Sequence, residues 1–87
     1  MFPKTCQAIR YLLETSLSPS TLEILDNSHL HVGHAGAREN PGQGHFHVRI
    51  AAQALQDLNK VQQHRKIYTV LAEVMPMIHA LEITILD

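Results

Sequence analysis

The sequence predicts a small α+β domain with elements in the order αββ(α)αβ around a three-stranded mixed sheet. Three observations predict it: a helical apolar stripe over 3–15, strict alternation over 45–51, and a β-branched end over 78–86. With 87 residues, the chain has room for a single domain over 1–87 and not for two. Hydrophobic residues make up 45% and charged residues 17%, which is typical of a folded protein.

The first element is expected to be a helix over 3–15, with Pro3 in its first turn. Its apolar side chains recur every three or four positions and therefore share one stripe; they are Cys6, Ile9, Leu12 and Leu13. A lone cysteine on such a stripe is most simply a small core residue. Serine and proline residues over 16–20 then break the helix before a short strand over 22–26.

The segment 45–51 is expected to be a half-buried strand because apolar and polar residues alternate along it. One face is apolar and the other polar; the apolar face carries Phe46, Val48 and Ile50, and the polar face carries His45, His47 and Arg49. We therefore interpret His45 and His47 as ordinary surface residues opposite the core.

A short helical turn over 54–58 is expected next, and Asn59 can cap a longer helix over 60–75 that Pro76 closes. The expected apolar side of this helix carries Val61, Tyr68, Leu71 and Met75. His64 falls on the same side, so we interpret it as a structural, buried imidazole. The last strand, over 78–86, turns Leu81, Ile83 and Ile85 one way and Glu82 and Thr84 the other.

The order of the elements fixes the directions of the strands. Two strands joined by a loop pair antiparallel, whereas a strand–helix–strand connection is a right-handed parallel crossover. The middle strand should therefore run antiparallel to the first and parallel to the last. This arrangement brings the long glycine-rich loop over 27–44, the strand start at His45 and the strand start at His79 to one end of the sheet.

Charge and cysteine content exclude several classes of function. Seven basic residues stand against eight acidic ones, so no basic excess supports charge-driven binding to nucleic acid or to a membrane. The single cysteine, Cys6, allows neither an internal disulfide nor a thiolate metal cage, which fits a reducing compartment. No apolar run is long enough for a membrane span and no secretory signal opens the chain, so we expect a cytoplasmic protein.

Seven histidines are the unusual feature of the composition, and five of them lie between His29 and His47. Neutral imidazole binds zinc, copper and iron. His29, His31 and His34 lie in the glycine-rich loop, where no helical spacing constrains them, so a solvated polar turn is an alternative interpretation. His79 differs because it opens a strand at the sheet end where side chains can reach a partner.

Five short segments in this order resemble the BolA-like proteins over nearly the entire chain: LEILDNS at 22–28, GHAG at 33–36, HFHV at 45–48, HRKIY at 64–68 and IHAL at 78–81. The resemblance implies an αββααβ fold similar to a class II KH domain, with helices packed on one face of the sheet. It also implies that the protein is not an enzyme.

The resemblance further implies a monothiol glutaredoxin as the partner, with a 2Fe–2S cluster held between the two proteins together with glutathione. The cluster would serve trafficking or the sensing of iron and redox state, and none would be tightly bound by the isolated protein. The matching ligand positions are His79 and His34, with His31 and then His29 as less favoured choices for the second ligand. Histidine ligation of one iron has a chemical precedent in Rieske centres. A weak homodimer is left open.

The alternative is a KH-like DNA- or RNA-binding transcriptional regulator, because some members of the family are described in that way. Against it stand the net charge of −1 and a long helix whose only basic residues are Lys60, Arg65 and Lys66. The GHAG segment also lies between strands, whereas the nucleotide-clamping GxxG loop of KH domains joins two helices. A metal hydrolase would need a general base, for which Glu39 is the one acidic residue in the loop.

Overall fold

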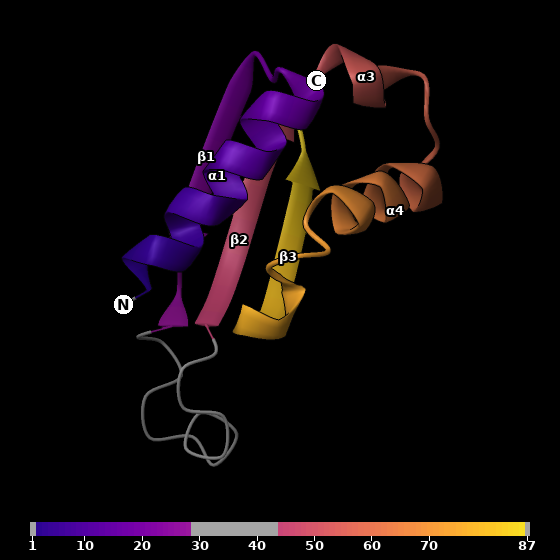
Figure 1. Ribbon diagram of the computed structural model, residues 1–87. Helices are drawn as coiled ribbons and strands as arrows, with labels where there is room; N and C mark the ends of the chain where they lie inside the picture. Colours follow the sequence, from indigo (N-terminus) through magenta and orange to yellow (C-terminus); the bar gives the residue numbers. More distant parts are fainter. Residues whose placement is uncertain (1, 29–43, 87) are drawn as a thin grey trace.

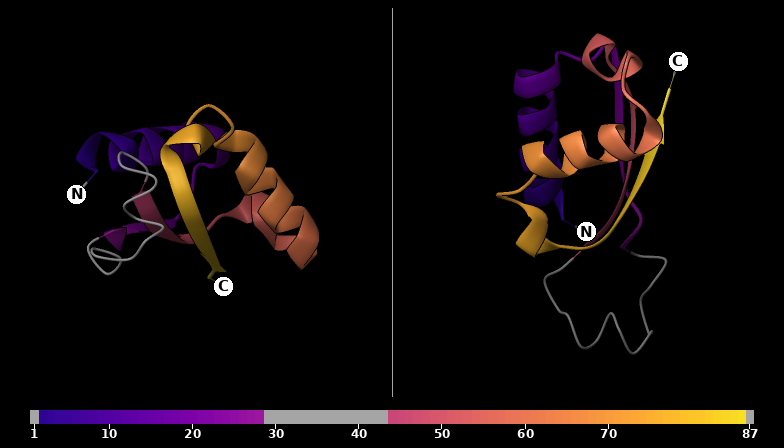
Figure 2. Two further views of the ribbon diagram at one scale, coloured as in Figure 1. Left: turned by 90° about the horizontal axis from the view of Figure 1, so that it is seen from below. Right: turned by 90° about the vertical axis from the view of Figure 1, so that its right-hand side faces the viewer.

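The computed structural model describes residues 2–28 and 44–86. Its elements follow in the expected order: α1 (Pro3–Leu17), β1 (Thr21–Asp26), β2 (Gly44–Ala51), α3 (Gln53–Gln56), α4 (Lys60–Val70), the short 3₁₀ helix η2 (Met75–Met77) and β3 (Ile78–Ile85). In Figure 1 and in the side view of Figure 2, the helices α1 and α4 lie against one face of the sheet. The protein is therefore an α+β fold of two layers.

The sheet has the topology that the sequence predicts. Its order is β1-β2-β3, with β2 antiparallel to β1 and parallel to β3. In the register, Val48 pairs with Ile24 on one side and with Ile83 on the other, so the three side chains share one face. This apolar row faces the helices, and the residues of the central strand β2 on this face, Phe46, Val48 and Ile50, are fully or nearly buried.

The helix α1 extends to Leu17, slightly beyond its expected end. Ser18 then adopts a left-handed conformation with φ of 46°, and its N–H donates to the carbonyl of Glu14, which closes the last turn. The buried residues of α1 are Thr5, Ile9, Leu13 and Leu17. Cys6 stands at the margin of this stripe, partly buried and packed against the core.

The helix α4 turns a different side to the core from the one that the sequence pattern favours. Val61 and Tyr68, expected in the core, have exposed fractions of 59% and 41%, whereas Ile67, which the pattern did not place there, is fully buried. Leu71, expected on the same side as Val61, is fully buried as predicted. Apolar residues occupy two overlapping stripes of this helix, so periodicity alone does not distinguish them. Packing of α4 against α1 selects the stripe through Ile67.

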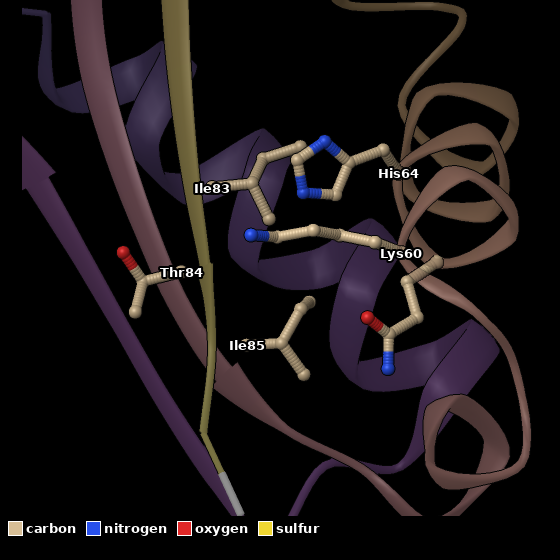
Figure 3. Close-up of a pocket in the computed structure, with 6 residues that line it drawn as sticks. Lys60, His64, Ile83, Thr84 and Ile85 are labelled. Atoms are coloured by element: carbon tan, nitrogen blue, oxygen red, sulfur yellow. The ribbon is translucent and has the colours of Figure 1, made fainter.

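The start of α4 agrees with the sequence prediction, whereas its end does not. Asn59 caps it as predicted, in a capping box where its side chain accepts from the Gln62 N–H and the Gln62 side chain accepts from the Asn59 N–H. The helix ends at Val70, however, and the expected end, Met75, belongs to η2. The prediction that His64 is a buried structural imidazole is wrong. His64 is only partly buried and lies beside β3, not inside the core (Figure 3).

The sheet face opposite the helices carries polar side chains of all three strands. Arg49 on β2 contacts Glu23 on β1, with 2.9 Å between the guanidinium Nε and the carboxylate Oε1. His45 and His47 lie on the same face of β2, each partly buried. None of the helices in the described ranges is long and apolar enough to cross a membrane.

Candidate histidine site at one end of the sheet

The start of β3 contains an irregularity that places His79. Gly44 pairs with Ile78 and His45 pairs with Ala80, so His79 is one extra residue on β3 between two paired positions. An extra residue of this kind is a β-bulge, which re-aims side chains and is frequent beside functional sites. Beyond the bulge the register is regular, from Phe46 opposite Leu81 onwards.

Two imidazoles lie close together at this bulge. The ring centroids of His45 and His79 are 4.9 Å apart with an interplanar angle of 56°. His79 is exposed and His45 is partly buried. The expectation that both strand starts meet at one end of the sheet is confirmed, whereas the interpretation of His45 as an ordinary surface residue leaves out this ring contact.

The loop histidines cannot be placed beside this pair. His34, His31 and His29 lie outside the described residues, as do the GHAG segment at 33–36 and Glu39. Within 2–28 and 44–86, no three His, Cys, Asp or Glu side chains converge as a metal site would require. A metal held by His79 would therefore need donors beyond this part of the chain.

A hydrogen-bond chain holds the backbone at the start of β2. The N–H of His45 donates to the hydroxyl of Ser28 at 3.0 Å, and the N–H of Asn27 donates to the carbonyl of His45 at 2.8 Å. The carboxylate of Asp26 accepts from the N–H of Ser28 at 3.0 Å and from the N–H of Phe2 at 2.6 Å. Ser28 is buried, so these bonds fix the end of β1, the start of α1 and the backbone of His45 together.

Asp26 is the charged acceptor in this chain of hydrogen bonds. Partial burial by itself raises the pKa of its carboxyl, but hydrogen bonds from the Ser28 side chain and from the backbone N–H groups of Phe2 and Ser28 outweigh that effect and hold the pKa at about 2. The carboxylate is therefore charged throughout the neutral range. Asp26 and Ser28 were not among the residues predicted to form the site, although an aspartate two residues before a serine at a strand end is a recognisable Asx-turn pattern.

His47 is tied to the neighbouring strand and is unlike His79 in this respect. Its Nε2 lies 2.7 Å from the hydroxyl oxygen of Thr84 and 3.5 Å from the carboxylate Oε2 of Glu82. The side chain of His47 is 16% exposed, whereas that of Glu82 is 72% exposed. The Nε2 atom of His47 thus has a protein partner, and the interpretation of His47 as a structural residue of the sheet surface agrees with these contacts.

Cys6 is a poor candidate for a metal ligand at neutral pH. Burial is the main cause that raises the pKa of its thiol, and the nearby Asp26 carboxylate raises it further, against a smaller opposing effect of Arg10. A thiol with a raised pKa stays protonated, whereas metal binding requires the thiolate. Histidine is therefore the stronger donor type at this end of the described protein.

Gly44 allows the aromatic packing beneath the site. A Cβ atom at this position would lie 2.5 Å from the ring of Phe46 and 2.8 Å from the ring of Phe2. These two rings pack edge to face with centroids 6.4 Å apart. The absence of a side chain at Gly44 thus lets Phe2 cover the start of β2 directly below His45.

Comparison with known proteins gives consistent matches. A family model described as BolA-like protein matches residues 13–86. Among curated relatives, SufE-like protein 1 of Arabidopsis thaliana is 42% identical over 79 residues, which cover 86% of this chain and 21% of that protein. The DNA-binding transcriptional regulator BolA of Haemophilus influenzae is 33% identical, with 86% of this chain and 69% of that protein covered.

Solved structures match over a larger share of both chains. The BolA domain of SufE1 from Arabidopsis thaliana has a TM-score of 0.75 at 36% identity and covers 92% of this chain and 87% of its own. BolA1 from the same plant has a TM-score of 0.77 at 34% identity, with the same coverage. The chain spans about a fifth of the curated SufE-like protein 1 and about half of the curated protein BOLA1, at 21% and 48%.

Proposed function

Because this chain belongs to the BolA-like protein family, we propose that it is an accessory protein for a 2Fe–2S cluster shared with a monothiol glutaredoxin and glutathione. In this role it catalyses no reaction. It supplies imidazole ligands, and its reducing compartment is the cytoplasm. The cluster is carried for transfer or for the sensing of iron and redox state.

The exposed ring of His79 on the bulge of β3 is the observation that carries the proposal. A ligand to a cluster shared between proteins must be accessible from outside, and the described residues provide fewer than three converging donors. Both properties suit a partner that brings the remaining ligands. Imidazole is also a chemically suitable donor, because histidine ligates one iron of the Rieske 2Fe–2S centres.

The second ligand in this proposal is His34, with His31 as the less favoured choice, and both come from the segment outside the described residues. In the sequence these residues fall between Ser28 and Gly44, and both of these described residues lie at the sheet end that the Asp26–Ser28 hydrogen bond holds. Both histidines are connected by a short stretch of chain to the sheet end where His79 lies.

Co-expression with a monothiol glutaredoxin tests the proposal. We expect the two chains to co-purify from anaerobic lysate with two iron atoms and two sulfides per heterodimer and with a visible charge-transfer spectrum. The chain purified alone is expected to be colourless. Co-purification without iron, or a spectrum identical to that of the glutaredoxin expressed without this chain, would contradict the proposal.

A DNA-binding function is the second candidate, favoured by the name of the Haemophilus influenzae relative. The basic residues of α4 argue against one continuous phosphate-binding face, since Lys60 lines a groove with β3 whereas Arg65 and Lys66 line another groove, beside Leu58. Binding of duplex DNA at two salt concentrations separates the alternatives. Submicromolar affinity with a steep salt dependence would favour the regulator.

A further inference from the structure

A groove separates the first turns of α4 from the last residues of β3, remote from the histidine pair. It has a volume of about 450 Å³ and is lined by Lys60, Gln63, His64, Ile83, Thr84 and Ile85. Figure 3 shows the side chains of Ile83 and Ile85 directed toward α4, with Lys60 and His64 reaching toward them, while Thr84 points to the other side of β3. The groove thus has an apolar floor and a wall that carries the ammonium group of Lys60.

The backbone of β3 forms the second wall, and its outer edge has no strand beside it in the described structure. The sheet order is β1-β2-β3, so β3 pairs with β2 alone. The N–H of Leu86 donates to the carbonyl of Ile50 on β2. Because backbone groups alternate in direction along a strand, those of Ile83 and Ile85 point away from β2, along the outer edge of β3 that borders the groove.

The groove is lined by a basic side chain and by no acidic one. The eleven residues of α4 include Lys60, Arg65 and Lys66 and no aspartate or glutamate. On β3, the acidic Glu82 lies on the opposite face, where it approaches His47. The Gln63 amide nitrogen is already used, because it donates to the carbonyl of Leu55. Among the residues that line the groove, Lys60 is the one with a permanent charge.

We propose that this groove binds an extended acidic peptide segment of a partner protein, which adds along the outer edge of β3 as a further strand. A free strand edge beside a helix supplies main-chain hydrogen bonds to an extended peptide, and side-chain pockets then give specificity. Alternate apolar side chains of the peptide contact Ile83 and Ile85. An acidic side chain two positions further along the peptide, on the same face, pairs with Lys60.

This docking surface is separate from the proposed cluster site. His79 and Ile85 lie at opposite ends of β3, roughly 20 Å apart at about 3.3 Å per residue. A peptide in the groove therefore leaves the ring of His79 uncovered. The two proposals stand or fall independently, because peptide binding needs neither iron nor glutaredoxin.

Selection from a phage-displayed library of random ten-residue peptides, followed by titration of one synthetic enriched peptide into ¹⁵N-labelled protein, tests the inference. We expect enriched sequences in which two apolar residues and one acidic residue occupy successive alternate positions, i, i+2 and i+4, so that all three share one face of the strand. The amide signals of Ile83 and Ile85 should shift and their hydrogen exchange should slow at least tenfold. N-methylation along the peptide should abolish binding at every second position only, as strand pairing requires.

Two charge reversals on α4 provide a matched pair. Lys60→Glu should weaken the peptide at least tenfold, and the new carboxylate in the first turn is compatible with the helix dipole, so the fold is retained. Lys66→Glu, which changes the same charge on the side of α4 that lines the other groove, should change the affinity less than twofold. The affinity should also be unchanged in His79→Ala.

Four results would overturn the inference. The first is a selection that enriches no peptide, and the second is a peptide whose affinity falls more in Lys66→Glu than in Lys60→Glu. The third is an N-methyl scan in which the loss of binding has no period of two. The fourth is a set of amide shifts of Ile83 and Ile85 that depend on the concentration of the protein alone. The last result would assign the edge of β3 to a second copy of this chain.

Discussion

The rings of His45 and His79 lie 4.9 Å apart across the parallel pair β2 and β3, because the bulge inserts His79 between the positions opposite Gly44 and His45. Without the extra residue, strict alternation would carry a single side chain of β3 to this face beside His45. The exposed imidazole on which the proposed function depends therefore lies at the bulge.

The ring contact predicts a local spectroscopic effect of His45→Ala. Removal of an aromatic ring at 4.9 Å should shift the imidazole proton resonances of His79 and broaden its range of orientations. His47→Ala is the matched control on the same strand and face, because its ring is bonded to Thr84 instead. Equal shifts of the His79 resonances in both variants would contradict the assigned geometry.

Gly44→Ala should destabilise the protein by about 1–3 kcal/mol, because the added Cβ would collide with the rings of Phe46 and Phe2. Phe46 is only 3% exposed and has little room to move. Urea unfolding measures the effect, and the double variant with Phe46→Leu should lose less than the sum of the two single variants. Strict additivity would show that the ring is not the cause.

Asp26→Asn should remove a pH-dependent contribution to stability. The folded-state pKa of about 2 is below the ordinary value of 3.8, so the contribution is complete above about pH 4 and is lost as the pH falls toward 2. Solvent screening limits it to at most about 2 kcal/mol. The difference in unfolding free energy between wild type and variant should therefore be present at pH 7 and nearly vanish at pH 2. A difference that does not depend on pH would contradict this origin.

Two truncations on α4 check which side of the helix faces the core. Ile67→Ala should cost about 2–5 kcal/mol, because Ile67 is fully buried in the main cluster. Val61→Ala removes an apolar side chain that is 59% exposed and should change the free energy of unfolding by less than about 0.5 kcal/mol. Chemical denaturation of the two variants gives both values, and a larger loss for Val61 would restore the interpretation from periodicity.

The sequence predicts the fold well where one local signal dominates. Alternation identifies β2 because Phe46, Val48 and Ile50 leave no second interpretation, and the connection rules then fix both strand pairings. It predicts α4 less well because Val61 and Ile67 lie on overlapping apolar stripes. Only the packing against α1, a contact between distant parts of the chain, decides between them.

The features of the candidate site also divide into those that sequence patterns predict and those that depend on contacts between distant parts of the chain. Topology predicts that the strand starts at His45 and His79 meet at one end of the sheet. The bulge at His79 has no composition signal, because it depends on how Gly44 and Ile78 pair with each other. The positioning bonds of Asp26 to Phe2 likewise join segments far apart in the sequence. The roles of His34 and His31 stay predictions, since these residues lie outside the described structure.

The most direct test of the central claim is visible circular dichroism of the complex with a monothiol glutaredoxin, recorded for wild type, His79→Ala and His64→Ala. His64 is the matched control, an imidazole on α4 that lines the groove beside Ile83 and not the sheet end. We expect the cluster spectrum to be lost or replaced in His79→Ala and kept in His64→Ala. An unchanged spectrum in His79→Ala, with iron still bound, would contradict the account.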